Sequence, residues 1–337
     1  MSHLLEVNGL TTVFKGDYGK NTSVDHIHFH VDKGETVCIV GESGCGKSVT
    51  SLSIMGLLSR DGKVTDGTVL FDGQNLFEMT EKELDAIRGN QMTMIFQDPL
   101  TSLNPVFTIG SQITESIRTH MGLSRAEAEK RAEMLLVRVG MPDAKRTMKK
   151  YPHTLSGGMR QRAMIAMALS CNPRLLIADE PTTALDVTIQ AQIMKLLKEL
   201  QQENGMAVIF ITHDIGLVAR MADRVIVMYA GQLIEEAPVK ELFHNPRHPY
   251  TKALLASVPT IRDDEDRQLV SIPGIVPENY DDIAGCRFAK RCRYYCEKCD
   301  KKQEDYEIAP GHTVKCTRRT SSPDRIVEDD SVEEGVL

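Results

Sequence analysis

The chain alternates between two patterns of apolar residues, one typical of buried strands and one typical of helices. Short apolar runs rich in β-branched residues predict strands at Thr36–Val40, Gly67–Phe71, Met92–Phe96, Leu175–Ala178, Ala207–Thr212 and Arg224–Tyr229. Apolar residues that recur every three or four positions predict helices at Lys47–Leu58, Thr80–Arg88, Gly157–Cys171 and Val187–Glu203. Strands that alternate with helices in this way predict an α/β fold with a largely parallel sheet and crossover helices.

A helical segment interrupts this alternation. The turn signals Asp98-Pro99 and Asn104-Pro105 introduce it, and a helical pattern rich in Arg, Glu and Ala then runs from Ile109 to Val139. We therefore expect a helical subdomain at 98–155, inserted into an α/β core that is made of 1–97 and 156–258.

The two ends of the chain differ from this core. Residues 1–50 have mainly strand-like patterns, so we expect the core to begin with a β subdomain. The C-terminal extension, 259–320, begins with a charged linker at 260–268 and continues with a cysteine-rich segment. The acidic tail, 321–337, has no aromatic residue and is predicted to be disordered.

Composition narrows the class of protein. Of the 337 residues, 41% are hydrophobic and 26% are charged, which is typical of a folded globular chain. No stretch approaches the roughly 20 apolar residues of a membrane-spanning helix, and the first residues lack a secretory signal, so we expect the protein in the cytoplasm. The 47 acidic residues outnumber the 40 basic ones, which disfavours nucleic acid as a partner.

A phosphate-binding loop follows the first buried strand. The run Gly41-Glu-Ser-Gly-Cys-Gly-Lys-Ser48 matches the P-loop pattern G-x-x-x-x-G-K-S/T, and it lies between a predicted strand and a predicted helix. Its backbone N–H groups and the helix N-terminus attract phosphate, Lys47 is expected to reach the β- and γ-phosphates, and Ser48 to bind Mg²⁺. The predicted nucleotide contacts of this loop are Gly41, Ser43, Gly44, Cys45, Gly46, Lys47, Ser48 and Val49.

Polar residues at the ends of three further strands complete a candidate hydrolytic site. One strand ends in Asp179, which can hold Mg²⁺, and Glu180, which can act as general base or orient an attacking water. Gln97 follows a second strand and can contact Mg²⁺ or water, and His213 follows a third and can contact the γ-phosphate. We therefore predict catalytic roles for Glu180, His213 and Gln97, and Mg²⁺ ligation by Ser48, Gln97 and Asp179.

With these residues, the chain resembles the ATP-binding cassette (ABC) ATPases. The run Leu155-Ser-Gly-Gly-Met-Arg-Gln-Arg162 is similar to the ABC signature motif, and Pro181-Thr-Thr-Ala-Leu-Asp186 is similar to the D-loop. Gln97 and His213 fall at the family's Q-loop and switch-histidine positions, and all elements follow the family's order over residues 5–255. The resemblance implies that Phe14 stacks on adenine, with Tyr18 as the weaker candidate.

The resemblance also implies a fold and a mode of assembly. The fold is a P-loop NTPase core of the RecA type with an antiparallel β edge and a helical subdomain. Cassettes of this family pair head to tail, so Ser156, Gly157, Gly158 and Asp186 are expected to act on ATP that the partner holds. Ser156–Gly158 precede a helix and so offer a second phosphate cradle.

Within that family the likeness is greatest to the ATPases of dipeptide and oligopeptide permeases. Three segments carry it, namely Met94–Pro105, Pro246–Leu254 and Gly285–Cys292. This implies an ATP-hydrolysing motor subunit at the cytoplasmic face of the membrane. Its implied partners are a second, paralogous ATPase, two transmembrane permease subunits and an extracellular solute-binding protein. The subgroup includes importers of nickel, glutathione and opines, so these cargoes are alternatives to peptides.

Two other classes of function fit the sequence less well. A non-transport ABC ATPase of chromosome organisation would carry a long coiled coil between Gln97 and Ser156, and one of translation would normally carry two cassettes. A metal-sensing regulator would leave the ATPase motifs unexplained.

Five of the eight cysteines lie in the C-terminal extension. In a reducing compartment such a cluster indicates metal binding before disulfides. Four thiolates suit a zinc ion or a 4Fe–4S cluster, and the wide spacing C-x5-C-x6-C-x16-C favours the cluster, which the resemblance also implies. The predicted ligands are Cys286, Cys292, Cys299 and Cys316, with Cys296 as an alternative to Cys299. Structural zinc and unliganded thiols remain alternatives.

Overall fold

The computed structural model describes residues 3–16, 19–98, 102–182, 185–257, 272–277 and 280–317. Several predictions fall outside these ranges: the adenine contact of Tyr18, two residues of the D-loop, the charged linker at 260–268 and the disordered tail at 321–337. Within the described ranges no helix combines the length and the apolar character needed to cross a membrane.

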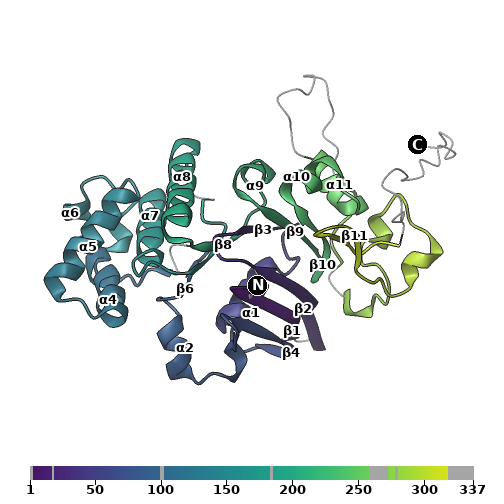
Figure 1. The fold of residues 1–337 in the computed structure, drawn as a ribbon, viewed down its shortest axis with the longest axis horizontal. Coiled ribbons are helices and arrows are strands. Elements are labelled where there is room, and N and C mark those ends of the chain that lie inside the picture. The colour runs from purple at the N-terminus through teal and green to yellow at the C-terminus, as the bar shows by residue number, and fades with distance from the viewer. Residues whose placement is uncertain are drawn as a thin grey trace.

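Two sheets form the framework of the described part of the chain (Figure 1). The large sheet has the strand order β11-β12-β10-β9-β3-β8-β7-β6, and the small sheet has the order β2-β1-β4-β5. Strands β9, β3, β8, β7 and β6 run parallel to one another, whereas β10 pairs antiparallel with β9 and the small sheet is antiparallel throughout. The strands are β1 Leu5–Gly16, β2 Gly19–Val31, β3 Thr36–Val40, β4 Gly62–Phe71, β5 Gln74–Asn75, β6 Met92–Ile95, β7 Leu175–Asp179, β8 Ala207–Ile211, β9 Arg224–Tyr229, β10 Gln232–Pro238, β11 Tyr306–Ala309 and β12 His312–Val314.

Helices cover the large sheet and form a lobe at one of its ends (Figure 1). They are α1 Lys47–Met55, α2 Glu81–Ile87, α4 Ile109–Met121, α5 Arg125–Arg138, α6 Ala144–Thr147, α7 Gly157–Ala168, α8 Val187–Asn204, α9 Ile215–Met221, α10 Val239–His244 and α11 Pro249–Ala256.

The central strands of the large sheet are buried on both faces, which explains their continuous apolar runs. Successive strand residues point to opposite faces, so Leu176 and Phe210 lie in a core with the helices α7 and α8. Ile177 and Ile209 lie in a second core with α1 and the small sheet.

The helical pattern predicted at 109–139 forms two helices, α4 and α5. Gly122 ends α4 in a left-handed conformation, with a φ of 64°. Ser124 then caps α5, and Glu127 completes a capping box. Helices α4, α5 and α6 lie between β6 and α7 along the chain and form the lobe on the left of Figure 1.

The C-terminal extension continues the large sheet. Strand β12 pairs with β10, and β11 pairs with β12, both antiparallel. The buried carboxylate of Glu235 in β10 accepts hydrogen bonds from the backbone N–H groups of Arg247 and His248 and contacts the ring of His312 at 2.8 Å. The sequence did not predict these strands, because they are short and lack an apolar alternation.

Candidate functional site

The polar residues predicted to act in hydrolysis gather at one edge of the large sheet. Strand β3 leads into the P-loop, β7 into Glu180, β8 into His213 and β6 into Gln97. Because β3, β8, β7 and β6 are parallel, all four connections leave from their carboxyl ends. In open α/β sheets this edge is where ligands bind.

Two glycines let the P-loop turn into α1. Gly44 and Gly46 have φ angles of 78° and 103°, which L side chains rarely adopt. A Cβ atom at position 46 would lie 2.5 Å from the carbonyl oxygen of Ser23, so only glycine fits there. The buried Lys47 donates from Nζ to the carbonyl oxygens of Gly41 at 2.9 Å and Glu42 at 3.0 Å. Its ammonium group is therefore held at the mouth of the loop, beside the helix N-terminus that attracts phosphate.

Ser48 and Asp179 form a candidate Mg²⁺ site. The Ser48 side chain hydrogen-bonds to the Asp179 carboxyl group, whose pKa is raised by burial. The Oδ1 atom of Asp179 is buried and has no hydrogen-bond partner. A buried carboxylate oxygen without a donor fits a cation ligand, and Mg²⁺ in phosphate-binding sites is held by one or two carboxylates together with phosphate oxygens. The residues present therefore fit Mg²⁺.

Glu180 lies between Gln97 and His213. The Gln97 side chain donates from Nε2 to Oε2 of Glu180 at 3.2 Å, and Nδ1 of His213 lies 3.3 Å from Oε1. Glu180 has a φ of 47°, an unusual backbone conformation for a residue with a side chain, and its N–H bonds to the carbonyl of Ile211 in β8. The fold thus brings together three residues that are far apart in sequence, with the carboxylate in a position to orient a water molecule.

The signature and D-loop residues open two other helices. Ser156 caps α7, with its hydroxyl accepting from Met159 N at 3.4 Å, and Asp186 caps α8, with Oδ1 accepting from Ile189 N at 3.0 Å. Ser156 and Gly157 are exposed, and no atom lies within 4 Å of the position that a Cβ of Gly157 would take. The cradle at the start of α7 therefore opens to solvent.

Phe14, the predicted adenine contact, belongs to the small sheet. It is half-buried and pairs with Gly62 of β4, where an added Cβ would lie 2.6 Å from the Phe14 ring. A larger residue at position 62 would therefore displace the ring.

The four cysteines predicted as ligands line one pocket, together with His248 and Phe288. Burial, together with the charges of the other three cysteines, raises the pKa of Cys286 to about 12. Cys296 does not line this pocket, but its Sγ lies 3.7 Å from Sγ of Cys299.

Two residues contact the P-loop that the sequence did not place there, and the sequence suggested for Arg291 only that its charge offsets that of a metal cluster. Tyr250 in α11 accepts a hydrogen bond from the backbone N–H of Glu42 at 2.8 Å, and Arg291 forms an ion pair with the Glu42 carboxylate. Tyr250 lies in the segment Pro246–Leu254, whose His-Pro pair signals a helix start. Nothing in that pattern indicated that the tyrosine would reach residue 42.

Comparison with known proteins identifies the family of the chain. The family model described as ABC transporter matches residues 24–183, and a model described as the C-terminal region of oligopeptide/dipeptide transporters matches residues 234–299. The chain is 54% identical over 318 residues to the oligopeptide transport ATP-binding protein AppD of Bacillus subtilis, covering 94% of this chain and 97% of that protein. It is 50% identical over 314 residues to the dipeptide transport ATP-binding protein DppD of Escherichia coli, covering 93% of this chain and 96% of that protein.

A solved structure supports the same fold. A dimeric ATP-binding cassette in a post-hydrolysis state with bound ADP and phosphate is 31% identical, with a TM-score of 0.64 over 70% of this chain and 98% of that chain.

The chain belongs to the ABC transporter family and is an ATPase of the cassette type. Within that family its relatives are the ATP-binding proteins of oligopeptide and dipeptide transport, so the family and the peptide subgroup predicted from the motifs are confirmed.

Proposed function

We propose that this chain is the ATP-hydrolysing motor subunit of an importer for dipeptides or oligopeptides. The observation that carries the proposal is the meeting of Gln97, Glu180 and His213 beside the P-loop edge of the sheet. The match of the C-terminal region to oligopeptide/dipeptide transporters supports peptides over nickel or glutathione as the cargo.

Each residue of the site has a separate proposed role in ATP hydrolysis. The P-loop backbone and Lys47 bind the phosphates, and Ser48, Asp179 and the amide oxygen of Gln97 hold the metal. Glu180 orients the attacking water and accepts its proton. Mg²⁺, when bound with ATP, neutralises phosphate charge in the transition state. Gln97 and His213 hold the Glu180 carboxylate in place, since both contact it.

A second cassette completes each ATP site in this proposal. Ser156 and Gly157 form an exposed phosphate cradle at the start of α7, and such a cradle needs an anion from outside the chain. A paralogous ATPase subunit, paired head to tail, would supply that anion as bound ATP. ATP then favours the closed pair, because its γ-phosphate contacts both subunits.

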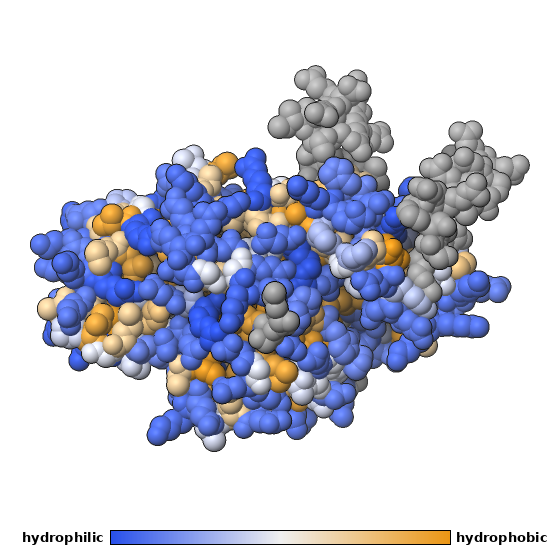
Figure 2. All heavy atoms as spheres, in the orientation of Figure 1, coloured by the Kyte–Doolittle hydropathy of each residue, from blue (hydrophilic) through white to orange (hydrophobic). Residues whose placement is uncertain are grey.

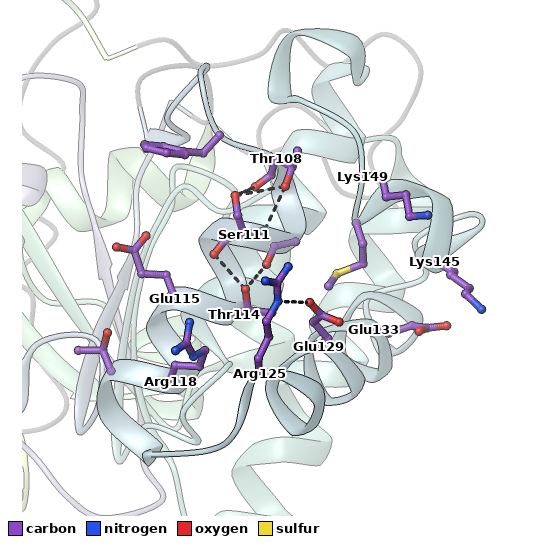
Figure 3. A pocket seen from close by; sticks show the side chains of 14 residues that line it. Thr108, Ser111, Thr114, Glu115, Arg118, Arg125, Glu129, Glu133, Lys145 and Lys149 are labelled. Carbon is purple, nitrogen blue, oxygen red and sulfur yellow. Dashed lines mark hydrogen bonds and ion pairs between the residues drawn. The ribbon is translucent and has the colours of Figure 1, made fainter.

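The helical lobe is the proposed contact with the two transmembrane permease subunits. A groove of about 900 Å³ runs along α4, α5 and α6 and is lined by charged side chains from all three, including Arg118, Arg125 and Lys145 (Figure 3). Arg125 pairs there with Glu129 at 2.9 Å.

Exposed apolar side chains lie in and beside that groove. Phe107 lies in its lining and is 52% exposed, and Val106 beside it is 70% exposed. Figure 2 shows further apolar side chains at the surface of the helical lobe. A mixed apolar and charged surface on the lobe that follows Gln97 along the chain suits a contact that transmits the state of the ATP site to a membrane subunit.

This assembly fixes the proposed location and the remaining partners. The motor lies peripherally at the cytoplasmic face of the membrane, and an extracellular solute-binding protein delivers the peptide to the permease subunits. The net charge of −7 argues against nucleic acid as a partner in this function.

The cysteine pocket is proposed to hold a 4Fe–4S cluster through Cys286, Cys292, Cys299 and Cys316. The four residues line one pocket, and burial of Cys286 disfavours an isolated thiolate there, so a cation is needed to stabilise the charged form. The wide spacing of the four cysteines along the chain, C-x5-C-x6-C-x16-C, favours the cluster over a zinc ion.

Transport assays test the function. Membrane vesicles with the reconstituted importer should take up labelled dipeptides when ATP is present, and Glu180→Gln in this chain should slow uptake. Competition with unlabelled nickel, glutathione and peptides identifies the cargo. ATPase activity that is independent of the permease subunits would instead favour a non-transport ABC ATPase.

The metal proposal has a separate test. Anaerobic purification should give a brown protein with about four iron atoms per chain, as the cluster requires. Cys292→Ser should lose iron and colour, while Cys296→Ser keeps them. A colourless anaerobic preparation with one zinc ion per chain would refute the cluster.

A further inference from the structure

The segment that carries the first two pocket cysteines also packs against the P-loop. Arg291 immediately precedes Cys292, and its guanidinium faces the carboxylate of Glu42, the second residue of the P-loop. The contact is bidentate, with Nη1 to Oε2 at 2.6 Å and Nη2 to Oε1 at 2.9 Å. Two parallel charge-assisted hydrogen bonds fix orientation as well as distance. The proposed hydrolytic mechanism makes no use of this pair.

Arg291 is held rigidly in this position. Its side chain is only 6% exposed. Nε donates to the carbonyl oxygen of Pro273 at 2.8 Å, and Nη1 also donates to the hydroxyl of Tyr229 at 3.2 Å. A buried guanidinium with all these partners has little freedom to follow a moving carboxylate, so Glu42 is the group that is constrained.

Glu42 in turn touches the residue that binds phosphate. Its backbone N–H donates to the hydroxyl of Tyr250 at 2.8 Å, and its carbonyl oxygen accepts from Nζ of Lys47 at 3.0 Å. Glu42 therefore links two residues: its side chain binds Arg291, and its backbone carbonyl binds Lys47. A shift of Glu42 would move the carbonyl that positions the Lys47 ammonium group.

A second arginine of the same segment supports the other side of the loop. Arg287 donates to the carbonyl oxygen of Ala230 at 2.5 Å and pairs with Asp25 at 2.7 Å. The next residue along, Gly231, donates its N–H to the carbonyl oxygen of Cys45 in the P-loop at 3.0 Å. The C-terminal segment thus reaches the loop at two points, directly at residue 42 and indirectly at residue 45.

We propose that Arg291 is a positioning residue for nucleotide binding, and that its pair with Glu42 holds the P-loop and Lys47 in the geometry that binds ATP. The C-terminal segment then sets the nucleotide affinity of this cassette. The inference rests on the proposed ATPase function, because it assumes that ATP binds at this P-loop. A merely structural pair, which attaches the C-terminal extension to the core, is the alternative.

The test compares arginine variants of the full-length chain, purified anaerobically. The dissociation constant of a fluorescent ATP analogue with Mg²⁺ is measured for Arg291→Ala, Arg291→Lys and the control Arg293→Ala. Arg293 is the same residue type two positions on, but it is exposed and lies over the ring of Tyr294. We expect about tenfold weaker binding for Arg291→Ala, which is the effect of losing roughly 1.4 kcal/mol of coupling. The dissociation constant of Arg291→Lys should lie between those of wild type and Arg291→Ala, because lysine keeps the charge but loses the bidentate contact. The dissociation constant of Arg293→Ala should equal that of wild type.

Three further measurements distinguish a role of Arg291 in positioning the P-loop from a purely structural role. In the assembled transporter Arg291→Ala should raise KM for ATP about tenfold and change kcat less than twofold, because Glu180, Gln97 and His213 are untouched. Glu42→Gln, which keeps the shape of the side chain, should weaken binding as Arg291→Ala does. The double variant should then be no weaker than either single variant, since one interaction is lost in all three.

Several results would overturn the proposal. One is nucleotide binding within twofold of wild type for Arg291→Lys and Glu42→Gln, variants that keep most of the packing even if Arg291→Ala fails to fold. Another is a double variant whose losses multiply. A lower thermal unfolding midpoint with unchanged nucleotide affinity would assign the pair a structural role. If the wild-type chain binds no ATP, the proposed function fails instead.

Discussion

Replacing Glu180 with glutamine removes one charge from the site and little else. The two side chains have nearly the same shape, so the Gln97 amide, now 3.2 Å from Oε2, still finds an oxygen acceptor. The backbone at position 180, with its φ of 47°, tolerates glutamine as well as glutamate. The variant therefore loses the negative charge that faces His213 and the group that accepts a proton from water. We expect its fold and its ATP affinity to stay within about twofold of wild type.

The expected size of the effect follows from the role of the carboxylate. General-base catalysis contributes about 10²- to 10⁴-fold to a rate. At about 1.4 kcal/mol per factor of ten, the barrier should rise by roughly 3–5 kcal/mol. Phosphate release is measured in the assembled transporter after the partner ATPase has been silenced at its own site, so that only this chain's P-loop site is observed.

A matched control and two outcomes decide the matter. Glu203→Gln alters an exposed carboxylate on α8, which pairs with Arg138 at the surface, and should leave turnover unchanged. Turnover of Glu180→Gln above a tenth of wild type would refute the assigned role. A loss of turnover matched by an equal loss of ATP affinity would also refute it, since the residue would then act in binding.

Three other predictions address binding, assembly and stability. Lys47→Ala should weaken ATP binding by about 10- to 100-fold, because a charged hydrogen-bond donor is removed, and equilibrium binding with unchanged affinity would contradict this. In a transporter in which Lys47→Ala disables the P-loop of this chain, only ATP bound by the partner ATPase is hydrolysed. Adding Ser156→Ala to this chain should slow that hydrolysis; an unchanged rate would place Ser156 outside the partner's ATP site. Burial lowers the pKa of His248 to about 4, so the unfolded chain binds the extra proton between about pH 6.5 and pH 4. The His248 contribution to the free energy of unfolding should therefore fall as pH drops through that window, by about 3 kcal/mol in all. Urea unfolding of His248→Asn, which keeps a capping oxygen, should lack this part of the pH dependence, and identical profiles would refute it.

The sequence alone located the strands and helices whose burial pattern is repetitive. Strands β3 and β9 have the predicted bounds, Thr36–Val40 and Arg224–Tyr229, because both faces of these strands are covered and every residue is apolar or packed. The P-loop, the signature and the acidic end of β7 were also found by pattern, since phosphate and metal chemistry requires particular residues at fixed local spacing. That local requirement makes the family recognisable from the amino-acid sequence alone.

Contacts between distant segments were decided by the tertiary structure. The approach of Gln97 and His213 to Glu180 depends on the order of β6, β7 and β8 in the sheet, and no local pattern encodes that order. The pairing of Arg291 with Glu42 spans 249 positions of the chain. It arises because the C-terminal extension joins the large sheet through β12 and also packs against the P-loop. A single arginine among several carries no sign of its partner in the sequence, since the ion pair forms only after both segments are buried together.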